Sequence, residues 1–150
     1  MAAFAAAGGG QAGAGGEGEF DRPANIAFDR SGNLLVVDGL NNRIQRYTSE
    51  GHYLGGWGKA GSGDGEFNLP WGISVDGSGY IYVADWRNDR VQKFDSQGLH
   101  LATWGTSGER DGEFHRPSGV AIDEEGDIYV ADWGNERIQV LDAQGNFITK

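Results

Sequence analysis

One set of polar residues occurs three times in this chain, at a constant interval of 47 residues. Each copy has an aspartate, an asparagine three positions later and an arginine two positions after that. A carboxylate can hydrogen-bond within a tight turn and pair with an arginine across a hairpin. Because every copy carries the set, we expect it to build a repeated structural unit rather than one unique site. The residues are Asp38, Asn41 and Arg43; Asp85, Asn88 and Arg90; and Asp132, Asn135 and Arg137.

The sequence offers one candidate set of metal ligands. The three aspartates just named offer the oxygen ligands that Ca²⁺ takes, so calcium held at a central channel stays an alternative to their structural role. Zinc has less support, because the three histidines fall at different positions of the repeat and do not converge. They are His52, His100 and His115. The chain has no cysteine and no Ser–His–acid set that the repeat brings together, so we predict no catalytic residue and no cofactor.

Tryptophan is the residue whose placement differs usefully between the copies. Trp86 and Trp133 share one position, just after the second aspartate and the third. Trp71 follows Pro70, and Arg87 follows Trp86. Exposed aromatic side chains beside an arginine are typical anchors of binding interfaces. We therefore predict a binding surface made of Trp71, Trp86, Arg87 and Trp133; the alternative is that these side chains cover the edge of a neighbouring unit.

The same interval of 47 residues relates the three prolines of the chain, Pro23, Pro70 and Pro117, so the sequence is three copies of one unit. No copy has helical periodicity over a useful length. Each copy instead predicts four short strands separated by glycine-containing turns. In the second copy these strands cover residues 72–76, 80–85, 90–95 and 99–104.

The second strand of the unit is apolar or aromatic on both faces, as shown by Tyr80-Ile81-Tyr82-Val83. A strand of this kind is expected where a sheet is covered by neighbours on both sides. Four such strands in a repeated unit predict the blade of a β-propeller, with a stacked solenoid as the alternative. The fold class is therefore all-β, with three four-stranded antiparallel blades.

At these positions the chain resembles the NHL-repeat family, named for an Asn-His-Leu tripeptide before the third strand. The surrounding pattern Gly-x-Phe-x-x-Pro-x-Gly, Ile-Tyr-Val-Ala-Asp and Arg-Ile-Gln-Val also looks like the family. The resemblance covers residues 18–150 and implies four-stranded blades, normally six to a ring, which serve mostly as platforms for proteins or RNA. A minority of related propellers are enzymes. The tripeptides here are Asn41-Asn42-Arg43, Asn88-Asp89-Arg90 and Asn135-Glu136-Arg137.

The first copy departs most from the pattern. Asn25 stands where the other copies have Gly72 and Gly119. Gly39 stands where they have tryptophan. We expect the first unit to be the most diverged of the three.

Charge argues against several classes of partner. The chain has 12 Lys and Arg against 22 Asp and Glu, a net charge of −10. Nucleic-acid binding and adhesion to anionic lipid both need a basic surface, so we predict neither. No apolar stretch is long enough for a membrane span, and the first residues lack the basic region of a secretory signal. We expect a soluble chain, and the absence of cysteine fits any compartment.

The repeat length also predicts an assembly. The units are a Gly/Ala-rich segment at 1–17 and repeats at 18–64, 65–111 and 112–150. Three blades cannot close a ring, because propellers have about 4–8. Residue 150 of one chain is in phase with residue 10 of a second, so we predict a homodimer that forms one six-bladed ring. Its last outer strand is expected from Phe147-Ile148-Thr149 rather than from Ala-rich residues 5–7, which would lie loosely outside.

These observations favour a non-catalytic propeller scaffold that binds a protein, a peptide or a small ligand at the mouth of its channel. The runner-up is a propeller hydrolase or lyase with its site at the same place, with or without calcium. A third hypothesis is a half-propeller whose only behaviour is self-assembly.

Overall fold

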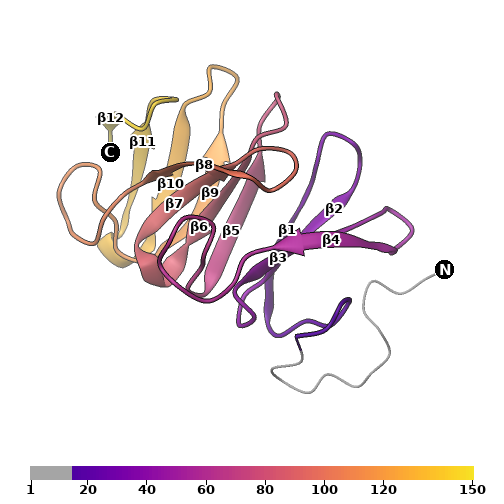
Figure 1. The fold of residues 1–150 in the computed structure, drawn as a ribbon. Helices are drawn as coiled ribbons and strands as arrows, with labels where there is room; N and C mark the ends of the chain where they lie inside the picture. Colours follow the sequence, from indigo (N-terminus) through magenta and orange to yellow (C-terminus); the bar gives the residue numbers. More distant parts are fainter. Residues whose placement is uncertain (1–14) are drawn as a thin grey trace.

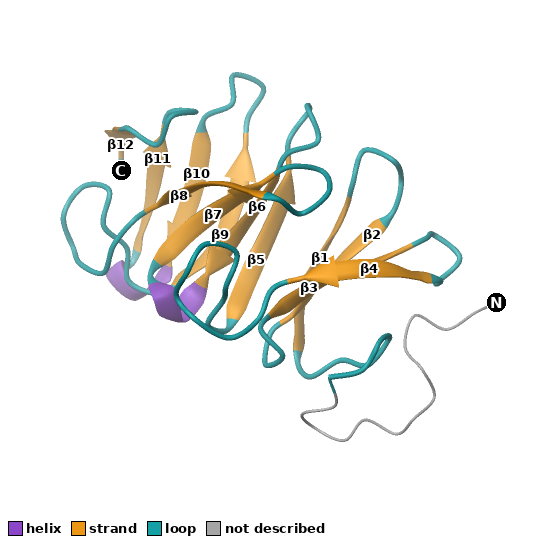
Figure 2. Ribbon diagram, viewed as in Figure 1, coloured by secondary structure: helices purple, strands orange, loops and turns teal. Residues whose placement is uncertain are grey.

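The structure is a computed structural model that describes residues 15–150. Its twelve strands form three four-stranded antiparallel sheets that follow one another along the chain (Figures 1 and 2). Blade 1 contains β1 (Pro23–Phe28), β2 (Leu34–Asp38), β3 (Arg43–Tyr47) and β4 (Tyr53–Trp57). Blade 2 contains β5 (Pro70–Val75), β6 (Ile81–Asp85), β7 (Arg90–Phe94) and β8 (His100–Trp104). Blade 3 contains β9 (Pro117–Ile122), β10 (Ile128–Asp132), β11 (Arg137–Leu141) and β12 (Phe147–Thr149).

The sheets pack side by side as propeller-like blades, which confirms the all-β prediction and the three four-stranded antiparallel units. The innermost strands make the contacts between blades, β1 with β5 and β5 with β9. The strands β4, β8 and β12 form the opposite edge of each sheet. Closure to six blades by a second copy stays a prediction. The expectation for residues 1–14, which include most of the Gly/Ala-rich segment, lies outside the described residues.

Strand bounds in blade 2 agree with the sequence-based ones to within two residues. The turn after β6 is more regular than expected, because residues Trp86–Asn88 form a short 3₁₀ turn, η1. Blade 3 repeats it as η2 (Trp133–Asn135). Each 3₁₀ turn ends on a residue in the left-handed conformation, Asp89 (φ 52°) and Glu136 (φ 53°), which reverses the chain into the next strand.

Two apolar clusters fill the space between blades. The first lies between blades 1 and 2 and the second between blades 2 and 3. Both faces of blade 2 are therefore covered by other blades, while blades 1 and 3 each have one face that no other blade covers. On that face of blade 1, Tyr47 packs against Phe20 and is buried, whereas Ile26 and Phe28 are exposed. The first cluster contains Leu35, Val37, Ile44, Phe67, Ile73, Ile81, Val83 and Phe94. The second contains Tyr82, Val91, Phe114, Ile128, Val130 and Leu141.

The outer strand of blade 3 is formed by the C-terminal segment, as predicted. β12 pairs with β11 through Val140 opposite Thr149 and Leu141 opposite Phe147. The aromatic and β-branched side chains of this segment suit a strand. Among residues 15–150 there is no helix of the length and apolarity that a membrane crossing requires.

Candidate functional site

The repeated polar set forms a buried network at one end of each blade. In blade 2, Asp85 Oδ2 accepts hydrogen bonds from Asn88 Nδ2 at 2.9 Å and from Arg90 Nε at 2.8 Å. Its Oδ1 accepts a bond from the backbone N–H of Asn68 at 2.8 Å. The expected pairing of aspartate with arginine is thus present, and blades 1 and 3 repeat it at the same distance.

The carboxylate does not cap the turn that follows it, which differs from the expectation drawn from turn chemistry. Asp85 makes no side-chain cap bond to η1. Its Oδ1 faces the connection between β4 and β5, where Asn68 presents a free N–H, so the tertiary neighbour and not the local turn takes the oxygen.

Arg90 ties the same glycine-rich connection to the blade that follows it. Its terminal nitrogens donate to the carbonyl oxygens of Ser62, Gly63 and Glu66 at 2.8 to 2.9 Å. Arg43 and Arg137 bind the corresponding carbonyls of their own blades. A planar guanidinium suits this task because its donors are fixed in direction.

A glutamine completes the network, and our sequence analysis did not single it out. Gln92 is fully buried, donates to Glu66 O at 2.7 Å and accepts from the N–H of Gly65 at 2.9 Å. Gln45 and Gln139 occupy the same place in blades 1 and 3. The signal that could have found them is the 47-residue interval, which they share with the aspartates.

Burial dominates the electrostatics of the network. Removal from water raises the pKa of Asp85, while the Asn68 N–H, the Asn88 amide and Arg90 oppose that rise. Both carboxylate oxygens are occupied by protein donors. Across residues 15–150 no three His, Cys, Asp or Glu side chains are grouped so as to hold one metal ion.

The structure brings the three predicted tryptophans into one row across blades 2 and 3. The Trp71 and Trp86 ring centres are 5.9 Å apart, and those of Trp86 and Trp133 are 6.2 Å apart. Trp71 comes from β5, Trp86 from η1 and Trp133 from η2. Trp71 is 44% exposed and Trp133 64% exposed, so a large part of this aromatic surface faces solvent.

Two arginines adjoin the row. The Arg116 guanidinium carbon lies 4.3 Å from the ring centre of Trp86, and that of Arg87 lies 5.9 Å from it. These are cation–π distances. Arg87 was predicted at this surface, whereas Arg116 was not. We call Trp71, Trp86, Trp133, Arg87 and Arg116 the tryptophan surface.

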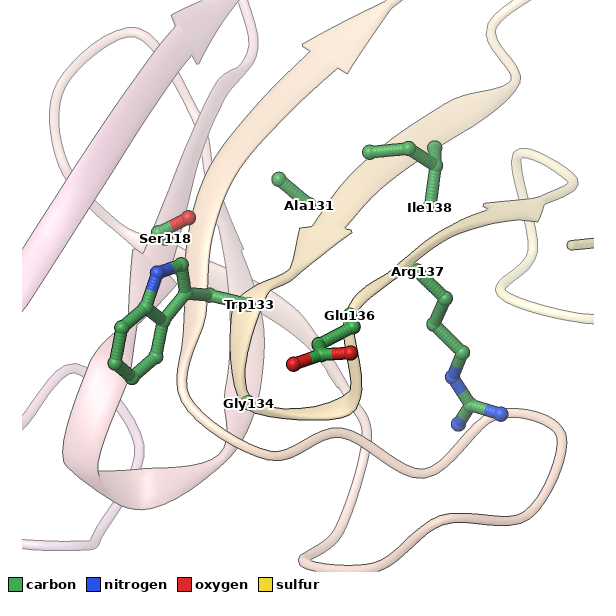
Figure 3. Close-up of a pocket in the computed structure, with 7 residues that line it drawn as sticks. All are labelled: Ser118, Ala131, Trp133, Gly134, Glu136, Arg137 and Ile138. Carbon is green, nitrogen blue, oxygen red and sulfur yellow. The ribbon is translucent and has the colours of Figure 1, made fainter.

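A hollow of about 620 Å³ opens beside the end of the row, on the uncovered face of blade 3. Figure 3 shows the Trp133 indole beside Ser118, with the Glu136 carboxylate and Ile138 on the same side of the blade. Ala131, Gly134 and Arg137 complete the lining. The hollow is therefore lined by apolar side chains together with one carboxylate and one guanidinium.

The three histidines are not brought together. His52 lies before β4, His100 begins β8, and His115 lies in the connection before β9. His100 Nε2 is 2.7 Å from Thr103 Oγ1. His115 lines a second hollow, of about 320 Å³, with Ser107, Glu109 and Asn135 among its other lining residues.

The family model for the NHL repeat matches residues 67–94 and 114–141, which run from the loop before β5 to the end of β7 and from the loop before β9 to the end of β11. This chain contains two NHL repeats. The matched segments belong to blades 2 and 3, the two copies that carry the glycine and the tryptophan that blade 1 lacks. No curated protein sequence matches the NHL-repeat chain.

Solved structures share its fold at low sequence identity. A putative exported protein of Bacteroides fragilis is 20% identical over 94% of the NHL-repeat chain and 40% of its own, with a TM-score of 0.68. Virginiamycin B lyase from Staphylococcus aureus is 15% identical over 83% and 39%, with a TM-score of 0.64. Hydrazine synthase of Kuenenia stuttgartiensis is 20% identical over 85% and 34%, with a TM-score of 0.66. The NHL-repeat chain thus spans less than half the length of these structures.

Proposed function

We propose that this NHL-repeat chain is a non-catalytic scaffold that binds a protein, a peptide or a small ligand on the tryptophan surface. The observation that carries the proposal is the row itself. Three indoles from three separate segments meet at one edge of the blades, and in a single chain Trp71 is 44% and Trp133 64% exposed. Tryptophan and arginine are the residues most enriched among the side chains that dominate binding energy.

We also propose that the scaffold is a six-bladed ring made of two copies. Each copy leaves apolar side chains exposed on the outward faces of blade 1 and blade 3, among them Ile26, Phe28, Tyr129 and Ile138. Exposed faces and strand edges of this kind favour association. Light scattering at micromolar concentration tests this step. We expect the mass of two chains, and a stable mass of one chain would contradict the ring.

The binding role is tested with a displayed library of random peptides, selected on the wild-type protein. We expect recovered peptides to lose binding to the Trp71→Ala and Trp86→Ala variants and to keep it with Leu99→Ala. Leu99 is a suitable control because it is exposed and lies in the turn before β8. Peptides that bind all variants equally would contradict the assignment of the surface.

One observation favours the runner-up, a hydrolase or lyase. His115 and Glu109 line the same hollow, so a base and an acid share one exposed site. Quinupristin, the compound bound to an inactive virginiamycin B lyase variant among the similar structures, is the probe for this alternative. Cleavage of quinupristin, measured with and without Ca²⁺ and abolished in His115→Ala, would replace the scaffold hypothesis.

A further inference from the structure

Each of the two junctions between blades contains an equivalent hydrogen bond. Asn42 Oδ1 accepts from the N–H of Leu69 at 2.7 Å where blade 1 meets blade 2. Asp89 Oδ1 accepts from the N–H of Arg116 at 2.7 Å where blade 2 meets blade 3. All four residues have φ between 52° and 57°, a conformation uncommon for residues other than glycine.

The acceptor and the donor of a third such pair lie in different blades, the acceptor in blade 3 and the donor in blade 1. Glu136 holds the acceptor position in blade 3 and has φ 53°. Arg22 holds the donor position in blade 1 and has φ 51°. Within residues 15–150 neither makes the corresponding bond. Both backbones therefore already have the conformation of a blade junction, although each lacks a neighbouring blade.

The type of side chain at the donor position correlates with the residue that the preceding blade has at the tryptophan position. Arg116 stacks on Trp86, whereas Leu69 follows a blade that has Gly39 at the tryptophan position. An arginine at position 22 therefore suits a preceding blade that carries tryptophan. Trp133, 64% exposed at the end of blade 3, is that tryptophan.

The exposed apolar side chains of blades 3 and 1 are the counterparts of side chains that are buried where two blades meet. Tyr82 and Val91 of blade 2 are buried against Ile128 and Val130 of blade 3. Their counterparts on blade 3, Tyr129 and Ile138, are exposed. At the other end of the chain Ile26 and Phe28 are exposed, while their counterparts Ile73 and Val75 belong to the cluster between blades 1 and 2.

From these four observations we infer that blade 3 of one copy docks head to tail on blade 1 of a second copy, and that Arg22 of the second copy completes the tryptophan surface. Its guanidinium stacks on Trp133 and its backbone N–H donates to the Glu136 carboxylate, whose charge is opposite. Ile26 and Phe28 of the second copy cover Tyr129 and Ile138. The inference rests on the two-copy ring proposed above, and supplies the residues that close it at two equivalent junctions.

Exchange of charges tests the junction itself. Glu136→Arg places two arginines at each junction, and Arg22→Glu places two carboxylates there. Each variant alone should weaken dimerisation about tenfold or more, because like charges meet twice in the ring. An equimolar mixture should restore it, because one junction then pairs Arg with Glu and the other is wild type. A dimer that both variants form as well as the wild type would overturn the junction while leaving the two-copy ring standing.

Footprinting with hydroxyl radicals gives a second, independent measurement. In the wild-type protein Trp133 should be protected relative to Trp71, although it is the more exposed of the two in a single chain. Ile138→Glu should release the dimer and expose Trp133, and Leu99→Glu should change neither. Circular dichroism checks that both variants fold. Reactivity of Trp133 that equals or exceeds that of Trp71 in the dimer would overturn the stacking of Arg22 on it.

Discussion

Blades 2 and 3 contain the same pentapeptide, Ile-Tyr-Val-Ala-Asp, at residues 81–85 and 128–132. In blade 2 all five residues are buried, and Tyr82 is 2% exposed. In blade 3 the alternate residues open to solvent, and Tyr129 is 39% exposed. The strands have the same register with their own neighbours, so the difference comes entirely from what covers the sheet.

The comparison separates two kinds of stabilisation. The network of aspartate, arginine and glutamine has equivalent partners and nearly equal distances in both blades, because its groups come from one blade and from the connection that precedes that blade. Packing of the second strand needs a neighbouring blade and exists only where one is present. A blade and the connection before it therefore supply the whole of this polar network, whereas the apolar packing of the second strand needs another blade.

Removal of the network carboxylate should have the largest effect, and the same effect in both blades. Asp85→Ala leaves the Arg90 guanidinium buried without its charged partner, which costs about 3–5 kcal/mol of unfolding free energy. Asp132→Ala should cost a similar amount. Denaturant unfolding measures both, with Glu124→Ala, in the turn between β9 and β10, as an exposed control in blade 3. A loss below about 1 kcal/mol in either blade would show that the network is not structural.

Removal of the second-strand tyrosine should instead distinguish the blades. Tyr82→Ala should cost about 3 kcal/mol, because the ring is buried against blade 3 and stacks on Trp104. Tyr129→Ala should cost less than half of that in a single chain. If two copies close a ring, the cost at Tyr129 should rise with protein concentration. Equal, concentration-independent costs would mean that burial does not explain the difference between the blades.

The tryptophan surface spans the two blades, and its effect should appear in binding rather than in folding. Trp86→Ala should weaken the binding of a selected peptide by roughly 1–3 kcal/mol, since Trp86 lies at the centre of the row. Isothermal titration calorimetry measures this loss. A lowered melting temperature with unchanged peptide affinity would show that Trp86 packs the blades together and does not bind.

The smallest expected effect is on the pH dependence of stability, through two glutamates in the loops before blades 2 and 3. The Arg110 guanidinium lowers the pKa of Glu113, and the Gly63 N–H lowers the pKa of Glu66. A lowered folded-state pKa contributes stability above the unfolded value of about 4.3, and this contribution is lost as the pH falls through the folded value. Thermal melts across that range should show a shallower loss for Glu113→Gln than for the wild type. An unchanged pH profile would contradict the prediction.

Repetition made much of this fold predictable. The 47-residue interval, the β-branched and aromatic strands and the glycine turns are local properties of the chain, and they led to twelve strands in three blades. The pairing of Asp85 with Arg90 followed from the same logic, because the two residues face each other at the ends of paired strands. The contact between Trp86 and Trp133 followed from their equivalent positions in successive repeats, which fall at the same height of adjacent blades.

Contacts between segments far apart in the sequence were decided only by the tertiary structure. The residue that takes Asp85 Oδ1 lies 17 positions earlier, and the stacking of Arg116 on Trp86 crosses from one blade to the next. The sequence determined what each blade is, since strands, turns and polar pairs depend on neighbours within one repeat. The tertiary structure decided which of two identical pentapeptides is buried, because burial depends on a second surface that the pentapeptide does not encode.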